Sequence, residues 1–457
     1  MSTNGLRLIL RTAVEQTIQR KHTLRTLDGF QACCNVMDDE KIMKKADSNE
    51  SDLSSRLAEL FKSNIAVIAG SSMVNGLGTG AISTYVSLYF LSIGGDPLRL
   101  GIMTSMSAVI QCLVLFLGGF IADHYGRRRV MVIAAFYAAV FPALYALIRE
   151  WQIFIIASAI GAIGAVSSPA SHATVADSIP AGRRTTGIST LQVVSSLPMV
   201  FSPLIGGWLI ETYGLQIGFR LGCELTAAMA SISAVMLLLF LKETMRQRRI
   251  QKPGALENST ERDGGELSAK SRNSLLALLF SYGLIAFANG LVGSYYILYA
   301  TQVIGLKGFD WGVIVSLQFL LAMFLKIPGG WASDRFGKKK VMIISILTCI
   351  PCIVMFTFSQ SFLQAAIAFT LLATTGMYYA PSHEALQADL TPREVRGRIT
   401  ALWDISGAVA VALGAPLGGF FFQTISPATP FYIFAAVELT AALLILFAVK
   451  EPQRAED

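Results

Sequence analysis

The chain carries little charge for its length. Of its 457 residues, 15% are Asp, Glu, Lys or Arg, whereas 53% are hydrophobic, and the mean hydropathy is +0.55. Soluble domains typically contain ~25% charged residues, so this composition excludes an ordinary soluble protein. Residues 131–148 contain no charge at all over a length that crosses the ~30 Å hydrocarbon core as a helix. Because only helices satisfy their own backbone there, we expect an all-α integral membrane protein.

The sequence also lacks the patterns of redox, metal and nucleotide sites. Its six cysteines form no disulfide framework, and the CxxC at Cys349 and Cys352 has no second pair, which favours buried packing. No G-x-x-x-x-G-K-[ST] motif is present, which disfavours an ATP-driven pump, and there is no hydrolase signature or metal cluster. The net charge of +7 lies in loops, so no nucleic-acid partner is expected. We expect no enzyme activity and no cofactor.

Hydropathy predicts twelve membrane spans in two groups of six. The first six lie near residues 64–91, 99–122, 129–148, 152–175, 187–212 and 217–241, and the second six near 274–300, 310–333, 340–358, 362–386, 397–424 and 429–449. This pattern predicts a polar N-terminal tail at 1–61, a six-helix bundle at 62–241, a linker at 242–273, a second bundle at 274–449 and a tail at 450–457. We expect the first tail to be disordered, with Met37 as an alternative start.

The loop cations predict the orientation of the spans. One side carries Arg127, Arg128, Arg129, Arg183, Arg184, Arg335, Lys338, Lys339, Lys340, Arg393, Arg396 and Arg398, and the other carries Arg99, Arg149, Arg220 and Lys307. Because Lys and Arg are enriched in cytoplasmic loops, the side with more of them is expected to be cytoplasmic. Both termini and the linker are then cytoplasmic as well.

The two groups of spans repeat one another. GGFIADHYGRRR at 118–129 returns as GGWASDRFGKKK at 329–340, at a spacing of 334 − 123 = 211 between the aspartates. Asp177 pairs with Asp389 at a spacing of 212, and the sequence ELTAA at 224 returns at 438. The order and spacing of these matches predict two homologous bundles related by an axis along the membrane normal, which can rock against each other about their interface.

The repeated G-x-x-x-D-x-x-G-[RK]-[RK]-[RK] loops, with D-x-x-P-x-x-x-R after spans 4 and 10, resemble the signature of the major facilitator superfamily. The resemblance covers residues 62–451 and implies a secondary transporter that works by rocker-switch alternating access. It also implies that a charge network at the cytoplasmic ends latches the bundles in the outward-open state.

The residues of this expected gate follow from the two loops. Gly119 and Gly330 are expected to allow close helix approach, and Gly126 and Gly337 to allow a sharp turn. Each loop carboxylate can lie against a helix N-terminus. The candidate gate set is Gly119, Asp123, Gly126, Arg127, Arg128, Asp177, Arg184, Gly330, Asp334, Gly337, Lys338, Asp389 and Arg396, in which Arg127 and Lys338 are placed to reach Asp177 and Asp389. His172, His383 and Glu384 are further gate candidates near the ends of spans 4 and 10.

Polar residues inside the spans are candidates for solute or proton binding, because they are costly in lipid. Asp404 aligns with Gln192 of the first half and is the first-ranked cavity carboxylate, with Lys326 as a cation that it can attract. Glu224 and Glu438 are expected to be structural, although burial would favour their protonated form and suit proton coupling. Hydrogen bonds to a solute are expected from Asn75, Gln111, Asn289, Tyr295, Tyr296, Gln318, Tyr378 and Tyr379.

Departures from a drug/proton antiporter pattern leave the type of transporter open. Ala157 stands where these antiporters carry an arginine, and Pro198 and Ser202 stand where the first glycines of their span 5 signature fall. The apolar spans still favour an amphipathic solute, so efflux of small organic molecules is placed ahead of an uptake symporter. A non-transporting sensor or scaffold is the alternative from another class, although two intact gate motifs argue against it. The expected partners are a small-molecule solute, the lipid bilayer of the plasma membrane and H⁺ or Na⁺ as coupling ion, and the chain is expected to be a monomer.

Overall fold

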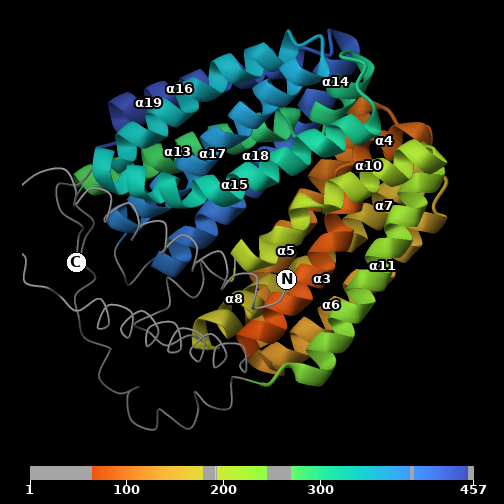
Figure 1. Ribbon diagram of the computed structural model, residues 1–457. Helices are drawn as coiled ribbons and strands as arrows, with labels where there is room; N and C mark the ends of the chain where they lie inside the picture. Colours follow the sequence, from red (N-terminus) through yellow and green to blue (C-terminus); the bar gives the residue numbers. More distant parts are fainter. Residues whose placement is uncertain (1–63, 179–190, 192, 244–268, 392–395, 451–457) are drawn as a thin grey trace, which may run out of the picture. The chain divides into compact units, whose positions relative to one another are not determined.

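The computed structural model describes residues 64–178, 191, 193–243, 269–391 and 396–450 (Figure 1). Several expectations fall outside these residues: the N-terminal tail, most of the linker, the last residues, Arg184 and Gln192. The side chains of Asp123, Asp177, Lys326 and Arg396 also lie outside the described part of the chain.

The described residues form helices in both halves of the chain. The first half contains α3 (Asn64–Ser83), α4 (Val86–Ser92), α5 (Pro97–Tyr125), α6 (Arg127–Leu147), α7 (Trp151–Gly161), η1 (Ala162–Val166), α8 (Ser167–Ser178), η3 (Leu197–Val200), α10 (Ser202–Tyr213) and α11 (Leu215–Phe240). The second half contains α13 (Ala269–Val292), α14 (Tyr296–Gln302), α15 (Gly308–Phe336), α16 (Lys338–Thr357), α17 (Phe362–Leu390), α18 (Arg396–Thr424) and α19 (Thr429–Ala448). Within the described residues, twelve stretches are long and apolar enough to cross a membrane, which confirms the twelve predicted spans.

Local sequence explains where these helices start and turn. Asp96 caps α5 by accepting a hydrogen bond from the Arg99 backbone nitrogen at 2.8 Å, and proline follows at the first helical position. Gly126 and Gly337 separate α5 from α6 and α15 from α16, and both have φ of +94°. Because side chains strain this backbone conformation, the repeated glycines are needed there, as predicted. We call the end of the bundles that carries these two glycines the turn end.

The first span of each bundle is interrupted at an equivalent place. Residues 84–85 separate α3 from α4, and residues 293–295 separate α13 from α14. The second break lies directly after Val292 and ends at Tyr295, whose counterpart in the first break is Tyr85. At the end of the bundles away from the turn end, which we call the opposite end, α4 contacts α14 (Figure 1).

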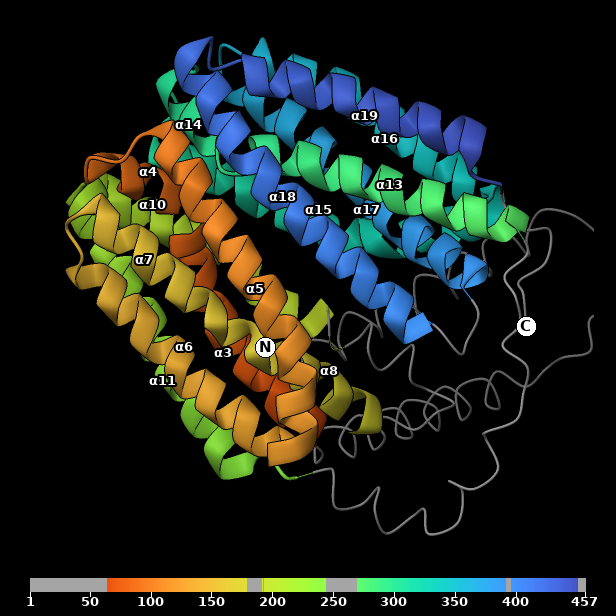
Figure 2. The same ribbon diagram turned by 180° about the vertical axis from the view of Figure 1, so that it is seen from behind.

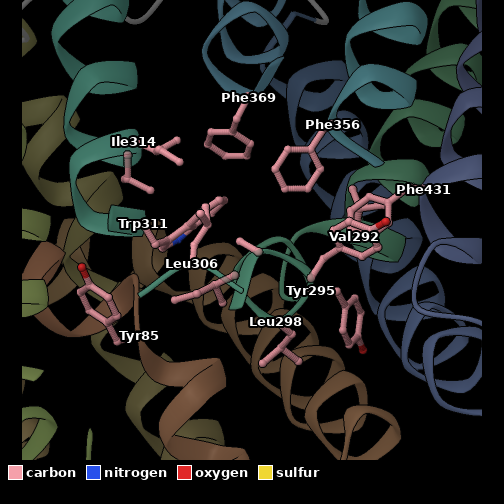
Figure 3. Close-up of a cluster of buried hydrophobic side chains, with 14 of the residues drawn as sticks. Tyr85, Val292, Tyr295, Leu298, Leu306, Trp311, Ile314, Phe356, Phe369 and Phe431 are labelled. Carbon is pink, nitrogen blue, oxygen red and sulfur yellow. The ribbon is translucent and has the colours of Figure 1, made fainter. Parts of the chain in front are cut away.

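The cores of the two bundles are joined at one end only. The largest buried cluster contains Tyr85 and Phe219 of the first half together with Leu298 and Trp311 of the second. Figure 3 shows Tyr85 and Tyr295 on two sides of this cluster, with Leu298 and Leu306 between them. Two smaller clusters lie closer to the turn end, and each belongs to a single bundle: one includes Val130 and Leu237, the other Met342 and Leu386.

Two helix pairs form most of the contact between the bundles. Helix α5 lies beside α18, as Figure 2 shows, and α10 lies beside α15. Because α5 of the first bundle is repeated as α15 of the second, and α10 as α18, the two pairs are equivalent to each other under the repeat. The large exposed side chains elsewhere, such as Ile133, Leu239 and Phe447, are apolar, as a surface in contact with lipid requires.

Candidate functional site

A cavity of about 640 Å³ lies between the two bundles. Its volume falls within the ~300–1,000 Å³ range of sites that take small organic molecules. The larger polar side chains on its wall are Gln111 of α5, His172 of α8, Tyr282 of α13 and Asp404 of α18. The remaining described lining residues are Ala108, Cys112, Leu115, Phe116, Ser168, Pro169, Ala286, Ala401, Ile405, Gly407, Ala408 and Val411.

The cavity begins where the contact between α5 and α18 ends. The Ser105 hydroxyl donates a hydrogen bond to the backbone oxygen of Ala412. Ala108, about one turn further toward the turn end of α5, and Val411, the neighbour of Ala412 on α18, already line the cavity. The walls are therefore continuous with the helix pair that joins the bundles. A small change in the angle between α5 and α18 would change the width of the cavity.

Asp404 is the carboxylate of this wall. Its side chain is exposed within the cavity, and no Lys or Arg is found among the described lining residues. Low-dielectric surroundings strengthen the field of such a charge, so the cavity favours a cationic over an anionic solute. Three sequence-predicted candidates, Gln111, His172 and Asp404, are thus brought to one cavity.

Two tyrosines bridge the bundles at the opposite end. The Tyr85 hydroxyl donates to the backbone oxygen of Pro203 at 2.8 Å within its own bundle and to that of Gly308 at 3.1 Å in the other bundle. The Tyr295 hydroxyl donates to the oxygen of Ala415 at 2.7 Å within its bundle and to that of Pro97 at 3.1 Å across the interface. Both rings are fully buried. We call this pair the tyrosine clamp.

Glycines make room for the tyrosine clamp. A Cβ atom on Gly101 would lie 2.3 Å from the Ala415 oxygen, and one on Gly419 would lie 2.2 Å from the Pro97 oxygen. On the other side of the interface, a Cβ on Gly312 would lie 2.4 Å from the Tyr85 hydroxyl. Side chains at these positions would hold the bundles apart, because such distances are far below van der Waals contact.

The tyrosine clamp was not predicted from the sequence, although the repeat contains a signal for it. Tyr85 and Tyr89 form a Y-x-x-x-Y pattern that returns as Tyr295 and Tyr299 at a spacing of 210. Tyr89 and Tyr299 also donate to backbone oxygens, of Ile148 and Thr357, but each bond stays within its own bundle. Tyr295 was expected to bind solute, whereas in this conformation its hydroxyl is held by two carbonyls at the interface.

The turn end contains one of the two predicted ion pairs. The Lys338 ammonium contacts the Asp389 carboxylate, and both side chains are about one-fifth exposed, at 21% and 22%. The equivalent Arg127 is buried at 6% exposure, and its expected partner Asp177 lies outside the described side chains. Asp334 is exposed.

The second cation of each turn holds the end of the last helix of its own bundle. The Arg128 guanidinium donates to the Leu238 oxygen at 2.7 Å, and its backbone nitrogen donates to Glu243 at 3.2 Å. In the repeat, the Lys339 ammonium donates to the oxygens of Leu446 and Val449 at 2.8 and 2.6 Å. Cations at helix C-termini are favourable because the last carbonyls lack partners. Arg128 therefore stabilises its own bundle in this conformation.

The close helix contacts predicted for Gly119 and Gly330 are made by the preceding glycines, Gly118 and Gly329. A Cβ on Gly118 would lie 2.8 Å from the Val166 oxygen, and one on Gly329 would lie 2.5 Å from the Met377 oxygen. No described atom lies within 4 Å of a Cβ on Gly119 or Gly330. The prediction was wrong by one residue in each copy, because a helix turns by about 100° per residue.

Other candidates lie away from the cavity between the bundles. His383 was expected at the gate, but it is buried at 5% exposure, stacks on Tyr282 and accepts a 3.1 Å hydrogen bond from the Trp403 indole, so it packs the second bundle. Glu384 and Glu224 are exposed. Asn75 and Tyr378 are half-buried and are not among the described residues that line the cavity. Asn289, Tyr296, Gln318, Tyr379 and Glu438 line a second cavity within the second bundle.

Comparisons with known proteins agree with this architecture. The Major Facilitator Superfamily model matches residues 68–310 and 278–457. Multidrug resistance protein MdtG of Proteus mirabilis is 25% identical over 404 residues, which cover 86% of this chain and 98% of the relative. The protein of the same name from Escherichia coli O9:H4 is 22% identical over 401 residues, which cover 85% and 93%.

Solved structures show the same fold. A bacterial homologue of the human lysosomal transporter Spinster, in an inward-facing and occupied conformation, aligns with a TM-score of 0.68 at 15% identity over 84% of this chain and 96% of its own. The human organic anion transporter MFSD10 aligns with a TM-score of 0.60 at 17% identity over 83% and 98%. With twelve candidate spans in its described part, arranged in two repeated bundles with a cavity between them, the chain belongs to the Major Facilitator Superfamily and is a multi-pass transporter of the cell membrane rather than an enzyme.

Proposed function

We propose that the chain is a secondary transporter that exports small amphipathic cations in exchange for protons. The observation that carries this proposal is the cavity of about 640 Å³ between the bundles, which has mainly apolar walls and one described carboxylate, Asp404. Such a site binds a molecule with an apolar body by burial and its positive group by charge. The relatives are named multidrug resistance proteins, which is consistent with efflux.

Alternating access follows from the two ends of the cavity. The tyrosine clamp holds the opposite end closed in this conformation, while the described turn-end clusters pack each bundle separately. Rocking about the interface would break the clamp and bring the charged turns together, where Lys338 and Asp389 form part of the predicted gate. The clamp therefore stabilises one conformation and is lost in the other, and a contact of this kind biases a two-state equilibrium.

The loop cations supply the orientation of this cycle. If the turn end is cytoplasmic, as the excess of Lys and Arg predicts, the conformation described here is open toward the cytoplasm. A solute would then enter from the cytoplasm or the inner leaflet and leave after the clamp opens. Cysteine labelling of the turn around Gly126 in intact cells tests this orientation, since labelling by a membrane-impermeant reagent from outside would refute it.

Flux in proteoliposomes tests the proposed function. The purified chain is reconstituted and offered a panel of cationic dyes, sugars and amino acids under an imposed pH gradient. Dye movement against its gradient is expected, and it should be lost in Asp404→Asn but kept in Glu224→Gln, whose carboxylate is exposed on α11. Accumulation of a sugar or amino acid instead would favour the uptake symporter, and a folded protein that moves no solute would favour the sensor or scaffold.

A further inference from the structure

A second cavity lies inside the C-terminal bundle. Its volume is about 240 Å³, and its wall is formed by α13, α14, α15, α16, α17 and α19. The described lining residues are Ile285, Asn289, Tyr296, Gln318, Ser345, Ile346, Cys349, Phe369, Leu372, Ala373, Thr375, Gly376, Tyr379, Phe434 and Glu438. It is distinct from the cavity between the bundles, with which it shares none of these residues. We call it the Glu438 chamber.

The carboxyl group of Glu438 dominates this chamber. Glu438 is 4% exposed on α19, and none of the described lining residues is Lys, Arg or His. The titratable groups that face it are Tyr296 of α14, Cys349 of α16 and Tyr379 of α17, all neutral in their ordinary state, while α13 and α15 contribute the amides of Asn289 and Gln318. A buried carboxylate without a cation is costly, so this group must carry a proton or take up a cation.

Polar groups around Glu438 allow a proton to reach it. The Tyr379 hydroxyl is buried in the chamber and has no hydrogen-bond partner among the described residues. A chamber of about 240 Å³ with amide and hydroxyl groups on its wall has room for several waters, which need two to four polar partners each. Water bridging Tyr379 and Glu438 would provide both the missing partner and a path for the proton.

We propose that Glu438 binds and releases the coupling proton in this chamber, apart from the solute. The role of this proton in driving export rests on the proposed function, whereas the proton site itself does not. No bond other than that to the proton is made or broken: the acid COOH loses H⁺ to water and the carboxylate regains it from water. The alternative, in which the deprotonated carboxylate of Glu438 binds a cation instead of a proton, is an outcome of the test below.

The chamber is connected to both functional parts of the interface. Helix α13 presents Ile285 and Asn289 to the chamber, and Tyr282 and Ala286 to the cavity between the bundles. Tyr296 of the chamber directly follows Tyr295 of the tyrosine clamp along the chain. A change of charge at Glu438 therefore acts on the helix and the break that carry one solute-cavity wall and one clamp residue.

The repeat supplies a matched control. Glu224 occupies the position in α11 that Glu438 occupies in α19, at a spacing of 438 − 224 = 214, within the same ELTAA sequence. It is exposed and is not among the described lining residues of either cavity. Glu438→Gln and Glu224→Gln therefore make the same chemical change in a chamber and on an exposed helix face.

Two transport assays separate proton coupling from solute binding. In proteoliposomes, Glu438→Gln is expected to lose dye accumulation driven by a pH gradient while keeping dye exchange at equal pH, whereas Glu224→Gln keeps both. Gradient-driven accumulation in Glu438→Gln equal to that of the unmodified chain would overturn the inference while leaving the proposed export intact. Failure of the unmodified chain to move any dye would count against the proposed function alone.

A chemical assay tests the site without transport and without a variant. Carbodiimide reagents modify protonated carboxyl groups, and mass spectrometry locates the modified residue in the unmodified chain. Modification of Glu438 is expected, and it should decrease as pH is raised and be unaffected by Na⁺. A Glu438 that stays unmodified at every pH would refute the proton site, and protection by Na⁺ at constant pH would replace the proton by a cation and refute it as well.

Discussion

The tyrosine clamp offers a direct test of how the opposite end is held closed. Each clamp hydroxyl makes one bond within its bundle and one across the interface, and the cross-interface bonds of Tyr85 and Tyr295 are the longer ones, at 3.1 Å each. Only the cross-interface bonds are lost when this end opens. Replacing both residues with Phe keeps the buried rings and removes these two bonds from the closed state.

The expected shift follows from the strength of hydrogen bonds between membrane helices. Such bonds contribute ~0.6 kcal/mol on average, so each Phe variant should move the equilibrium toward the open state by about threefold. The two bonds share no partner, so the double variant should shift it by ~1.2 kcal/mol, or about eightfold, if the effects add.

Spin labels on either side of the interface measure this shift. Glu150, between α6 and α7, and Gln360, before α17, are both exposed at the opposite end and suit labelling in a background in which the native cysteines are replaced. Double electron–electron resonance should show a larger population of long distances between the two labels in Tyr85→Phe/Tyr295→Phe than in the chain with both tyrosines.

A matched control comes from the other two tyrosines of the repeat. Tyr89 and Tyr299 are buried and donate to carbonyls within their own bundles, at 2.7 Å each. Tyr89→Phe/Tyr299→Phe should therefore lower thermal stability without changing the distance distribution. Equal distance shifts in the two double variants would show that the clamp reasoning is wrong.

Three further predictions concern the interface and the turn end. Gly101→Ala would place a Cβ 2.3 Å from a backbone oxygen of α18, so dye transport should be lost with the chain still folded, whereas Gly283→Ala, which meets no described atom within 4 Å, should transport normally. Lys338→Asp should abolish transport by setting like charges together, and Lys338→Asp combined with Asp389→Lys should restore it in the same flux assay, unless the pair has no part in the gate. Lys307→Gln removes an exposed ion pair between the bundles and should leave the spin-label distances nearly unchanged. The hydrogen bond of that pair raises the pKa of Lys307 above its ordinary value of 10.5, so its charge is present at all lower pH and is lost only as pH rises through the raised value; a Lys307→Gln effect that changes between mildly acidic and mildly alkaline buffer would contradict this.

The expectations that the structure bears out depend on features that act locally along the chain. Span number and position follow from the length of apolar stretches, and the two turns at Gly126 and Gly337 follow from a backbone conformation that favours glycine. The pairing of Lys338 with Asp389 could also be predicted from the sequence, because the repeat placed both residues at one end of the bundle.

The sequence did not predict which face of each helix is buried. Glu224 and Glu438 lie in the same five-residue sequence of the repeat, yet one is exposed and the other is buried in a chamber. The close helix contacts predicted for Gly119 and Gly330 are instead made by Gly118 and Gly329, because the sequence did not show which face of the helix meets its neighbour. In a soluble helix, an apolar stripe identifies the buried face.

Lipid removes that stripe, because hydrocarbon chains are as apolar as the protein interior and both faces of a spanning helix can be apolar. The sequence by itself therefore determined the spans, their duplication and the turns between them. Only the tertiary structure decided which side of each helix meets its neighbour, and with it the tyrosine clamp, the cavity around Asp404 and the chamber around Glu438.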